Sequence, residues 1–124
     1  MKLYEIDITQ EENFSLLIIP DIGCSGCIYQ AKQFLADHID TPKIRFVVTS
    51  ITSKKDIEFK FEQLKDRVDK VLFDYNNRFI DQKIVEFYPR IIQFSFGKEV
   101  FNEEILPGKE DTLNTFEELF LSKN

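Results

Sequence analysis

Hydrophobic residues occur along this chain in short blocks, and their spacing changes between patterns typical of strands and of helices. Three blocks are short and uninterrupted, which favours strands, and they occupy residues 14–19, 44–48 and 71–73. The first two are almost purely apolar, as is typical of strands that are covered on both faces. We therefore expect these two strands to lie inside a sheet.

Three other segments repeat apolar residues every three or four positions, which predicts helices with one buried face. The positions are Ile28, Ala31, Leu35 and Ile39, then Ile57, Phe61, Leu64 and Val68, and finally Leu113, Phe116 and Phe120. The first helix begins at Cys24 and is ended by residues 40–42. Residues 53–56 form a capping box before the second helix, with Asp in place of Glu. Residues 57–61 also fit a strand, but the longer helical stripe favours a helix.

Hairpins are predicted near both ends of the chain. Residues 91–96 and 99–101 form two strands, and Gly97-Lys98 between them suits a type II′ turn, in which glycine comes first. Near the N-terminus Tyr4, Ile6 and Ile8 alternate with charged residues, and the polar residues 10–13 form a turn before strand 14–19. Residues 76–87 are mixed and leave room for one short helix.

The order of these elements, ββαβαβ(α)ββα, predicts an α/β fold. Strand–helix–strand units favour parallel pairing with right-handed crossovers, and the closing hairpin adds antiparallel strands. The expected architecture is a central mixed β-sheet flanked by helices, with an N-terminal β-hairpin extension. No linker or repeat interrupts residues 1–124, so we expect a single domain.

Composition narrows the functional classes. The 124 residues carry a formal net charge of -6, which disfavours binding to nucleic acid. No apolar run approaches the roughly 18–20 residues of a membrane span. The first residues include acids where a signal peptide needs an apolar core, so we expect a cytoplasmic location. A periplasmic or extracytoplasmic location is the alternative, if an export segment is missing. Most of the 13 Phe residues are interpreted as core.

Both cysteines of the chain lie in one window, Cys24-Ser25-Gly26-Cys27, between a buried strand and a helix. A helix N-terminus carries unpaired N–H groups and partial positive charge, which is expected to lower the pKa of the first thiol. The second sulfur follows one helical turn later, within reach of a disulfide. Cys24 can attack a substrate disulfide and Cys27 can resolve the mixed disulfide. The small residues Ser25 and Gly26 allow a partner chain to approach.

Other interpretations of the two cysteines remain open at this point. A zinc site needs four ligands, of which Cys24 and Cys27 supply half. The single histidine, His38, is better explained by contacts with the last carbonyls of its helix, so we expect no metal ligand there. A static disulfide, two inert thiols, or a metal shared across a dimer are alternatives. A peroxidase is the weakest of them, because the stretch between Pro20 and Cys24 lacks Thr.

The chain resembles the thioredoxin-like family, in particular its tethered thiol–disulfide oxidoreductase and peroxiredoxin-related branch. The resemblance covers nearly the whole element order. Its two specific points are the cysteine motif at residues 24–27 and Tyr88-Pro89 before strand 90–96. It implies that Pro89 is a cis proline facing the cysteine pair and that the backbone of Tyr88 is exposed to substrate. The alternative for Pro89 is a trans proline that starts a strand.

The sequence departs from the family beside the motif. Gly23 stands where the family has Trp, and Ile18 stands where it keeps a buried acid. Asp21 is closer to the motif in sequence, and we expect it to be a solvated turn residue on the break after the strand.

The leading hypothesis is a thiol–disulfide oxidoreductase with catalytic Cys24 and Cys27. Ser25, Gly26, Tyr88 and Pro89 would contact the substrate. Protein thiols or disulfides and a redox partner protein are the expected partners, and no cofactor is needed. The alternative is a non-enzymatic thioredoxin-like binding module whose cysteine pair is structural or vestigial.

Overall fold

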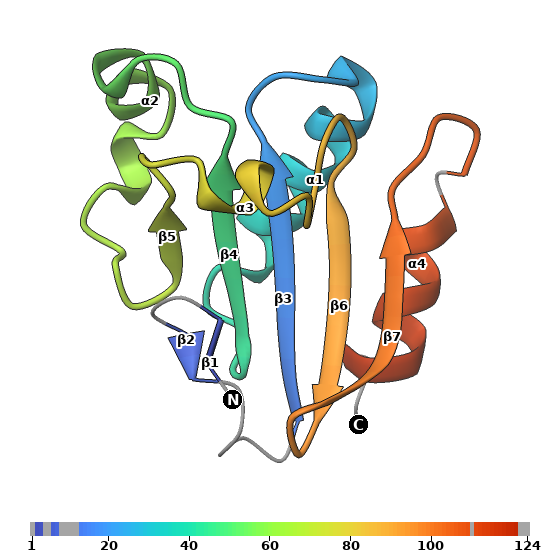
Figure 1. Ribbon diagram of the computed structural model, residues 1–124. Coiled ribbons are helices and arrows are strands. Elements are labelled where there is room, and N and C mark those ends of the chain that lie inside the picture. The colour runs from blue at the N-terminus through green and yellow to red at the C-terminus, as the bar shows by residue number, and fades with distance from the viewer. Residues whose placement is uncertain (1, 4–5, 8–12, 110, 122–124) are drawn as a thin grey trace.

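A five-stranded mixed sheet organises the chain in the computed structural model, which describes residues 2–3, 6–7, 13–109 and 111–121 (Figure 1). The strand order is β5-β4-β3-β6-β7. The strands are β3 (Asn13–Pro20), β4 (Ile44–Thr49), β5 (Val71–Phe73), β6 (Arg90–Ser95) and β7 (Lys98–Glu104). The prediction of an α/β fold with a central mixed sheet is confirmed.

The pairing of the strands follows from how they are connected. β3 and β4 run parallel because α1 (Ser25–His38) returns the chain to the starting edge of the sheet, and β4 pairs with β5 in parallel in the same way. β6 joins β3 antiparallel, and β7 joins β6 antiparallel. β3 therefore lies in the middle of the sheet, where a nearly continuous apolar strand is stable.

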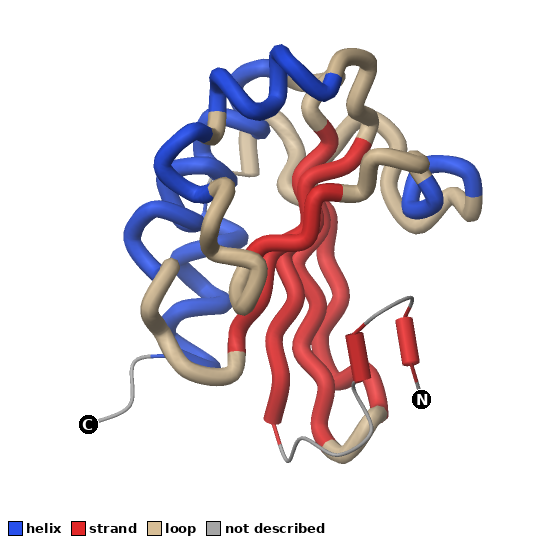
Figure 2. The backbone as a smooth tube through the Cα atoms, turned by 90° about the vertical axis from the view of Figure 1, so that its left-hand side faces the viewer, coloured by secondary structure: helices blue, strands red, loops and turns tan. Residues whose placement is uncertain are grey.

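The helices are unequally divided between the two faces of the sheet (Figures 1 and 2). One face carries α1, α2 (Lys54–Lys60) and α4 (Asp111–Phe116), whose apolar residues pack into a large cluster with Leu17 and Ile19 of β3. The other face carries α3 (Arg78–Asp81), and Phe79 packs there against Leu16 and Ile18 in a smaller cluster. The side chains of successive β3 residues thus point to opposite faces of the sheet.

The second predicted helix is shorter than its stripe of apolar residues. α2 ends at Lys60, because Phe61 leaves the helical region with φ -117° and ψ 35°, and a 3-10 helix, η1 (Glu62–Leu64), follows. Val68 is 81% exposed and does not extend the buried face. Ser53 caps α2 through its side chain, which accepts a hydrogen bond from the Asp56 N–H, so the predicted capping residue is confirmed.

The β6–β7 hairpin is present, but its turn lies one residue earlier than expected. Phe96 (φ 51°) and Gly97 (φ 84°) both have positive φ angles, which is the type I′ arrangement and corrects the predicted type II′ turn. β7 continues to Glu104 and is longer than the predicted residues 99–101. Gln93 pairs with Phe101 and Phe94 pairs with Glu99, so the register shifts there and Val100 is an extra residue on β7.

The N-terminal hairpin is formed by β1 (Lys2–Leu3) and β2 (Ile6–Asp7), which pair with each other in a separate two-stranded sheet. The sequence had suggested that the first strand forms a hairpin with β3. In the structure the hairpin is instead formed by β1 and β2 alone. Tyr4, Ile8 and the predicted turn up to residue 12 lie outside the described residues. At the other end of the chain α4 continues into a π-helix, η2 (Glu117–Leu121).

Candidate functional site

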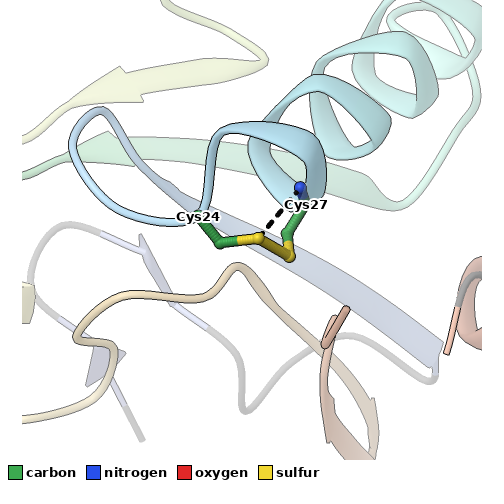
Figure 3. Close-up of a disulfide and its surroundings, with 2 residues drawn as sticks. All are labelled: Cys24 and Cys27. Carbon is green, nitrogen blue, oxygen red and sulfur yellow. Dashed lines mark hydrogen bonds between the residues drawn. A yellow bond between two sulfur atoms is a disulfide. The ribbon is translucent and has the colours of Figure 1, made fainter. Parts of the chain in front are cut away.

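The two cysteines form a disulfide at the N-terminus of α1 (Figure 3). Their Cα atoms are 5.3 Å apart, as the spacing of three residues in a helical turn allows. The sequence placed the pair at this strand–helix junction, and the structure confirms both the junction and the proximity of the two sulfurs.

Cys24 is the N-cap residue of α1. It is extended, with φ -69° and ψ 105°, and its carbonyl accepts the first helical hydrogen bond from the Ile28 N–H at 2.8 Å. Its sulfur accepts from the Cys27 N–H at 3.3 Å. No acidic residue occupies the first turn of α1. When the disulfide is reduced, the same N–H group and the partial positive charge of the helix N-terminus would favour a thiolate at Cys24.

The two cysteines differ in how far they are exposed to solvent. Cys27 is 4% exposed and belongs to the large core cluster, whereas Cys24 is half-buried at its edge. Ser25 and Gly26 between them are exposed. A Cβ atom added to Gly26 would meet nothing within 4 Å, so the surface over the motif is open. A molecule approaching from solvent therefore reaches Cys24 first.

The backbone of Phe87 lies directly against the motif. Its carbonyl accepts a hydrogen bond from the Cys24 N–H at 3.0 Å. Gly23 has φ +156°, and a Cβ atom there would lie 2.2 Å from the Phe87 oxygen. This close approach explains why glycine occupies the position at which the resembled family has Trp. The side chain of Phe87 itself is 64% exposed.

Sequence reasoning did not identify Phe87 as part of this region. The only local signal was its position immediately before Tyr88-Pro89, because the contact joins residues that are far apart in the chain. Tyr88, which was predicted to contact substrate, is half-buried and packs against the same core cluster as Cys24. The connection between α3 and β6 is thus brought to the cysteine motif.

Pro89 is buried at the start of β6, and the bond that precedes it is trans, as are the other peptide bonds of the described part of the chain. The cis proline implied by the family resemblance is therefore wrong. The carbonyl of Pro89 accepts from the Ile105 N–H at 2.8 Å and extends the β6–β7 ladder by one bond. Pro89 behaves as a residue that starts a strand, where its missing N–H costs nothing.

Asp21 is not the solvated turn residue that the sequence suggested. Its side chain is 3% exposed, and the Lys60 Nζ lies 3.1 Å from its Oδ2. The Lys32 Nζ lies 4.0 Å from Oδ1, which is buried and has no hydrogen-bond donor among the described residues. Hydrogen bonds to Asp56 and then to Asp21 raise the pKa of Lys60. Asp21 thus links α1 and α2 to the end of β3, because lysines from both helices reach it.

His38 lies at the opposite end of α1 from the cysteines. Its Nδ1 is 2.9 Å from the Thr41 hydroxyl and its Nε2 is 2.6 Å from Glu117 of η2. The predicted contacts with helix carbonyls are therefore replaced by side-chain contacts that join α1 to the C-terminal helix. Within the described ranges, no three His, Cys, Asp or Glu side chains form a group suited to a metal ion.

Comparison of the chain with protein-family models, with curated proteins and with solved structures finds no match. None of the described helices has the length and apolar character needed to cross a membrane.

Proposed function

We propose that this protein is a thiol–disulfide oxidoreductase that exchanges disulfides with protein substrates. The observation that carries the proposal is the Cys24–Cys27 disulfide at the N-terminus of α1, with Cys24 as the accessible N-cap residue and Cys27 in the core. This asymmetry suits a reaction in which one sulfur meets the substrate and the other acts from within the protein.

In the reducing direction both cysteines begin as thiols. The Cys24 thiolate attacks one sulfur of a substrate disulfide, the S–S bond of the substrate breaks, and one substrate thiolate leaves and takes up a proton. Cys27, after losing its proton, then attacks the Cys24 sulfur. This step forms the Cys24–Cys27 disulfide and releases the second substrate thiol. The two electrons come from the two cysteines, and a dithiol partner must supply them again.

The surroundings of Cys24 support a protein-sized substrate. Ser25 and Gly26 leave the motif open to an approaching chain, and the α3–β6 connection adjoins it with the exposed Phe87 and the half-buried Tyr88. We also propose that the fold is thioredoxin-like, because β3-α1-β4 followed by β6-β7-α4 has the order that the resemblance implies.

A non-enzymatic binding module is the second candidate, and exposed apolar side chains beside the motif favour it. Ile22 is 52% exposed and Phe87 is 64% exposed on the two segments that meet at Gly23. Such side chains would hold a partner whether or not the sulfurs react. Alkylation of the reduced protein by iodoacetamide at pH 7 separates the two candidates, since the module predicts that Cys24 reacts no faster than an ordinary thiol.

The proposed reaction is tested by reduction of insulin with dithiothreitol as the electron source. Cys24→Ser is expected to lose all protein-dependent turnover. Cys27→Ser, reduced, freed of dithiothreitol and then mixed with insulin, is expected to accumulate a mixed disulfide through Cys24, visible as a heavier species on a non-reducing gel. Thr115→Ala is the control, because it removes the hydroxyl of an exposed residue of α4 outside the motif and leaves both sulfurs and the surface around them unchanged. Turnover by Cys24→Ser equal to that of the natural protein would refute the proposal.

A further inference from the structure

The face of the sheet opposite α1 is covered over only part of its width. In Figures 1 and 2 α3 and the β1–β2 hairpin lie on this side, and no described helix or strand lies over β6 and β7. A cavity of about 360 Å³ occupies the open part, between β7 and the connection that follows α3. We call it the β6–β7 pocket. Its volume is within the range of small-molecule sites.

The floor of the β6–β7 pocket is apolar. It is formed by Ile92 and Phe94, alternate residues of β6 that point to this face, and Ile84 of the α3–β6 connection adds to it. Ile91, which directly precedes Ile92 in β6, points to the other face and belongs to the cluster on the α1 side. The floor therefore offers a surface for a short hydrocarbon or aromatic group.

One end of the pocket is formed by the guanidinium of Arg90. One terminal nitrogen donates to the Asn102 side-chain oxygen, and the other lies 3.5 Å from Glu104. The remaining donor, Nε, is buried and has no acceptor among the described residues. A buried donor without an acceptor is unfavourable, so a ligand oxygen placed there would be favoured.

The charged side chains that line the pocket are two cations and one carboxylate, and Glu104, which lies 3.5 Å from Arg90, is outside the lining. Arg90 and Lys83 are the two cations, and Lys83 is exposed on the connection that forms one wall. Glu99 is the single carboxylate of the lining, and the Asn102 amide donates to it at 2.9 Å. A carboxylate suits this end of the pocket because one of its oxygens could accept a charge-assisted hydrogen bond from the Arg90 Nε, the donor left without an acceptor among the described residues.

We propose that the β6–β7 pocket binds a small amphipathic carboxylate, with its carboxylate at Arg90 and its apolar part on Ile92 and Phe94. Nothing in this proposal depends on the redox chemistry of the cysteines. The two sites use different faces of the sheet, since Cys27 and α1 belong to the cluster on the opposite side.

The test uses octanoate as the probe and records amide chemical shifts of the whole oxidised protein. Octanoate is expected to cause saturable shifts that centre on β6 and β7. Octan-1-ol and octylamine, which have the same tail and no carboxylate, are expected to bind at least tenfold more weakly. Equal binding of octan-1-ol, shifts centred elsewhere, or no saturable shift would overturn the proposal.

Two substitutions with opposite expected effects sharpen the test. Arg90→Gln should weaken octanoate binding about tenfold or more, as expected for loss of a charge-assisted pair. Arg45→Gln, which removes an exposed arginine of β4 outside the pocket lining, is the matched control and should leave the affinity unchanged.

Because Arg90→Gln also disturbs contacts within the fold, Glu99→Gln provides the second arm of the test. It removes the exposed acid of the rim and should strengthen octanoate binding severalfold. Weaker binding in Glu99→Gln would contradict the assigned ligand charge.

Discussion

The two faces of the sheet are held together in different ways. On one face α1, α2 and α4 pack through a large apolar cluster that includes Phe46 and Phe116. On the other face α3 is a single turn, and the layer formed by α3 and its connection to β6 depends on polar contacts as well as on Phe79 and Val85. The first face is stabilised chiefly by burial, whereas the second needs specific hydrogen bonds to keep its backbone in place.

Asp74 and Phe87 show how the thinner layer is attached. The buried carboxylate of Asp74 accepts from the Thr49 hydroxyl at 2.8 Å and from the Phe79 N–H at 2.9 Å, which ties α3 to the end of β4. Further along, the Phe87 carbonyl accepts from the Cys24 N–H. The thinner layer therefore meets the disulfide through backbone atoms. The cysteine motif is therefore positioned by both layers, by one through packing and by the other through hydrogen bonds.

The largest expected difference between the two faces comes from a pair of aromatic truncations. Phe116→Ala and Phe79→Ala each remove a fully buried ring. Phe116→Ala should lower the free energy of unfolding by about 3–5 kcal/mol, because Phe34, Phe101 and Phe120 surround the ring and cannot collapse into the space. Phe79→Ala should cost less, since the short α3 can move toward the sheet. Urea denaturation measures both, and a larger loss in Phe79→Ala would reverse the comparison.

A pair of glycines tests the close approach at the motif. Gly23→Ala should lower the free energy of unfolding by about 1–3 kcal/mol, because alanine is strained at φ +156° and its Cβ meets the Phe87 carbonyl. Gly26→Ala is the matched control in the same motif. It lies within α1, has open space around it, and should change stability by about 0.5 kcal/mol in the favourable direction. Equal effects at the two positions would show that the Phe87 contact is unimportant.

The polar attachment of the thinner layer is tested by Asp74→Ala. The substitution removes the carboxylate that accepts from the Thr49 hydroxyl and the Phe79 N–H, and it should cost about 1–3 kcal/mol of stability. Hydrogen exchange should show the α3 amides opening more often, while those of α1 are unchanged. Asp81→Ala, which removes an exposed carboxylate of α3, should stay within about 0.5 kcal/mol of the natural protein. An equal effect of the two substitutions would argue against the role assigned to Asp74.

The smallest expected effect concerns the ion pair between Asp21 and Lys60, which lies on the side of the sheet that carries α1 and α2. Hydrogen bonds to Asp56 and to Asp21 raise the pKa of Lys60 above its usual 10.5. A raised pKa in the folded state means that the pair stabilises the fold fully below pH 10.5 and loses this contribution as the pH rises through the folded-state pKa. Asp21→Asn should move the pKa of Lys60 back toward 10.5 and cost about 1 kcal/mol or less, because Lys60 is partly exposed. An NMR titration of the Lys60 side chain measures the shift, and an unchanged pKa would exclude Asp21 as a cause.

Local patterns in the sequence predicted much of this fold. The apolar run of β3, the helical spacing after Cys24 and the capping residue Ser53 each depend on neighbours within a few positions, and all three are found in the structure. The turn at Phe96-Gly97 was misplaced by one residue. A turn at either position leaves the alternation of apolar and polar residues in the two strands intact, so the sequence pattern does not distinguish them. The register is determined by the bulge opposite Gln93 and Phe94 and by pairing with the neighbouring strand.

The features of the candidate site likewise fall into those that local sequence determines and those that depend on tertiary contacts. The sequence by itself determined that Cys24 and Cys27 stand at a strand–helix junction, one turn apart, because strand, break and helix are all local. Only the tertiary structure decided that Phe87 lies on Gly23, that Asp21 is buried between lysines of α1 and α2, and that Pro89 enters β6 through a trans bond. The contacts at Gly23 and Asp21 join segments separated by many residues, and the energy of packing those segments together, rather than the preference of any short stretch, determines where they meet.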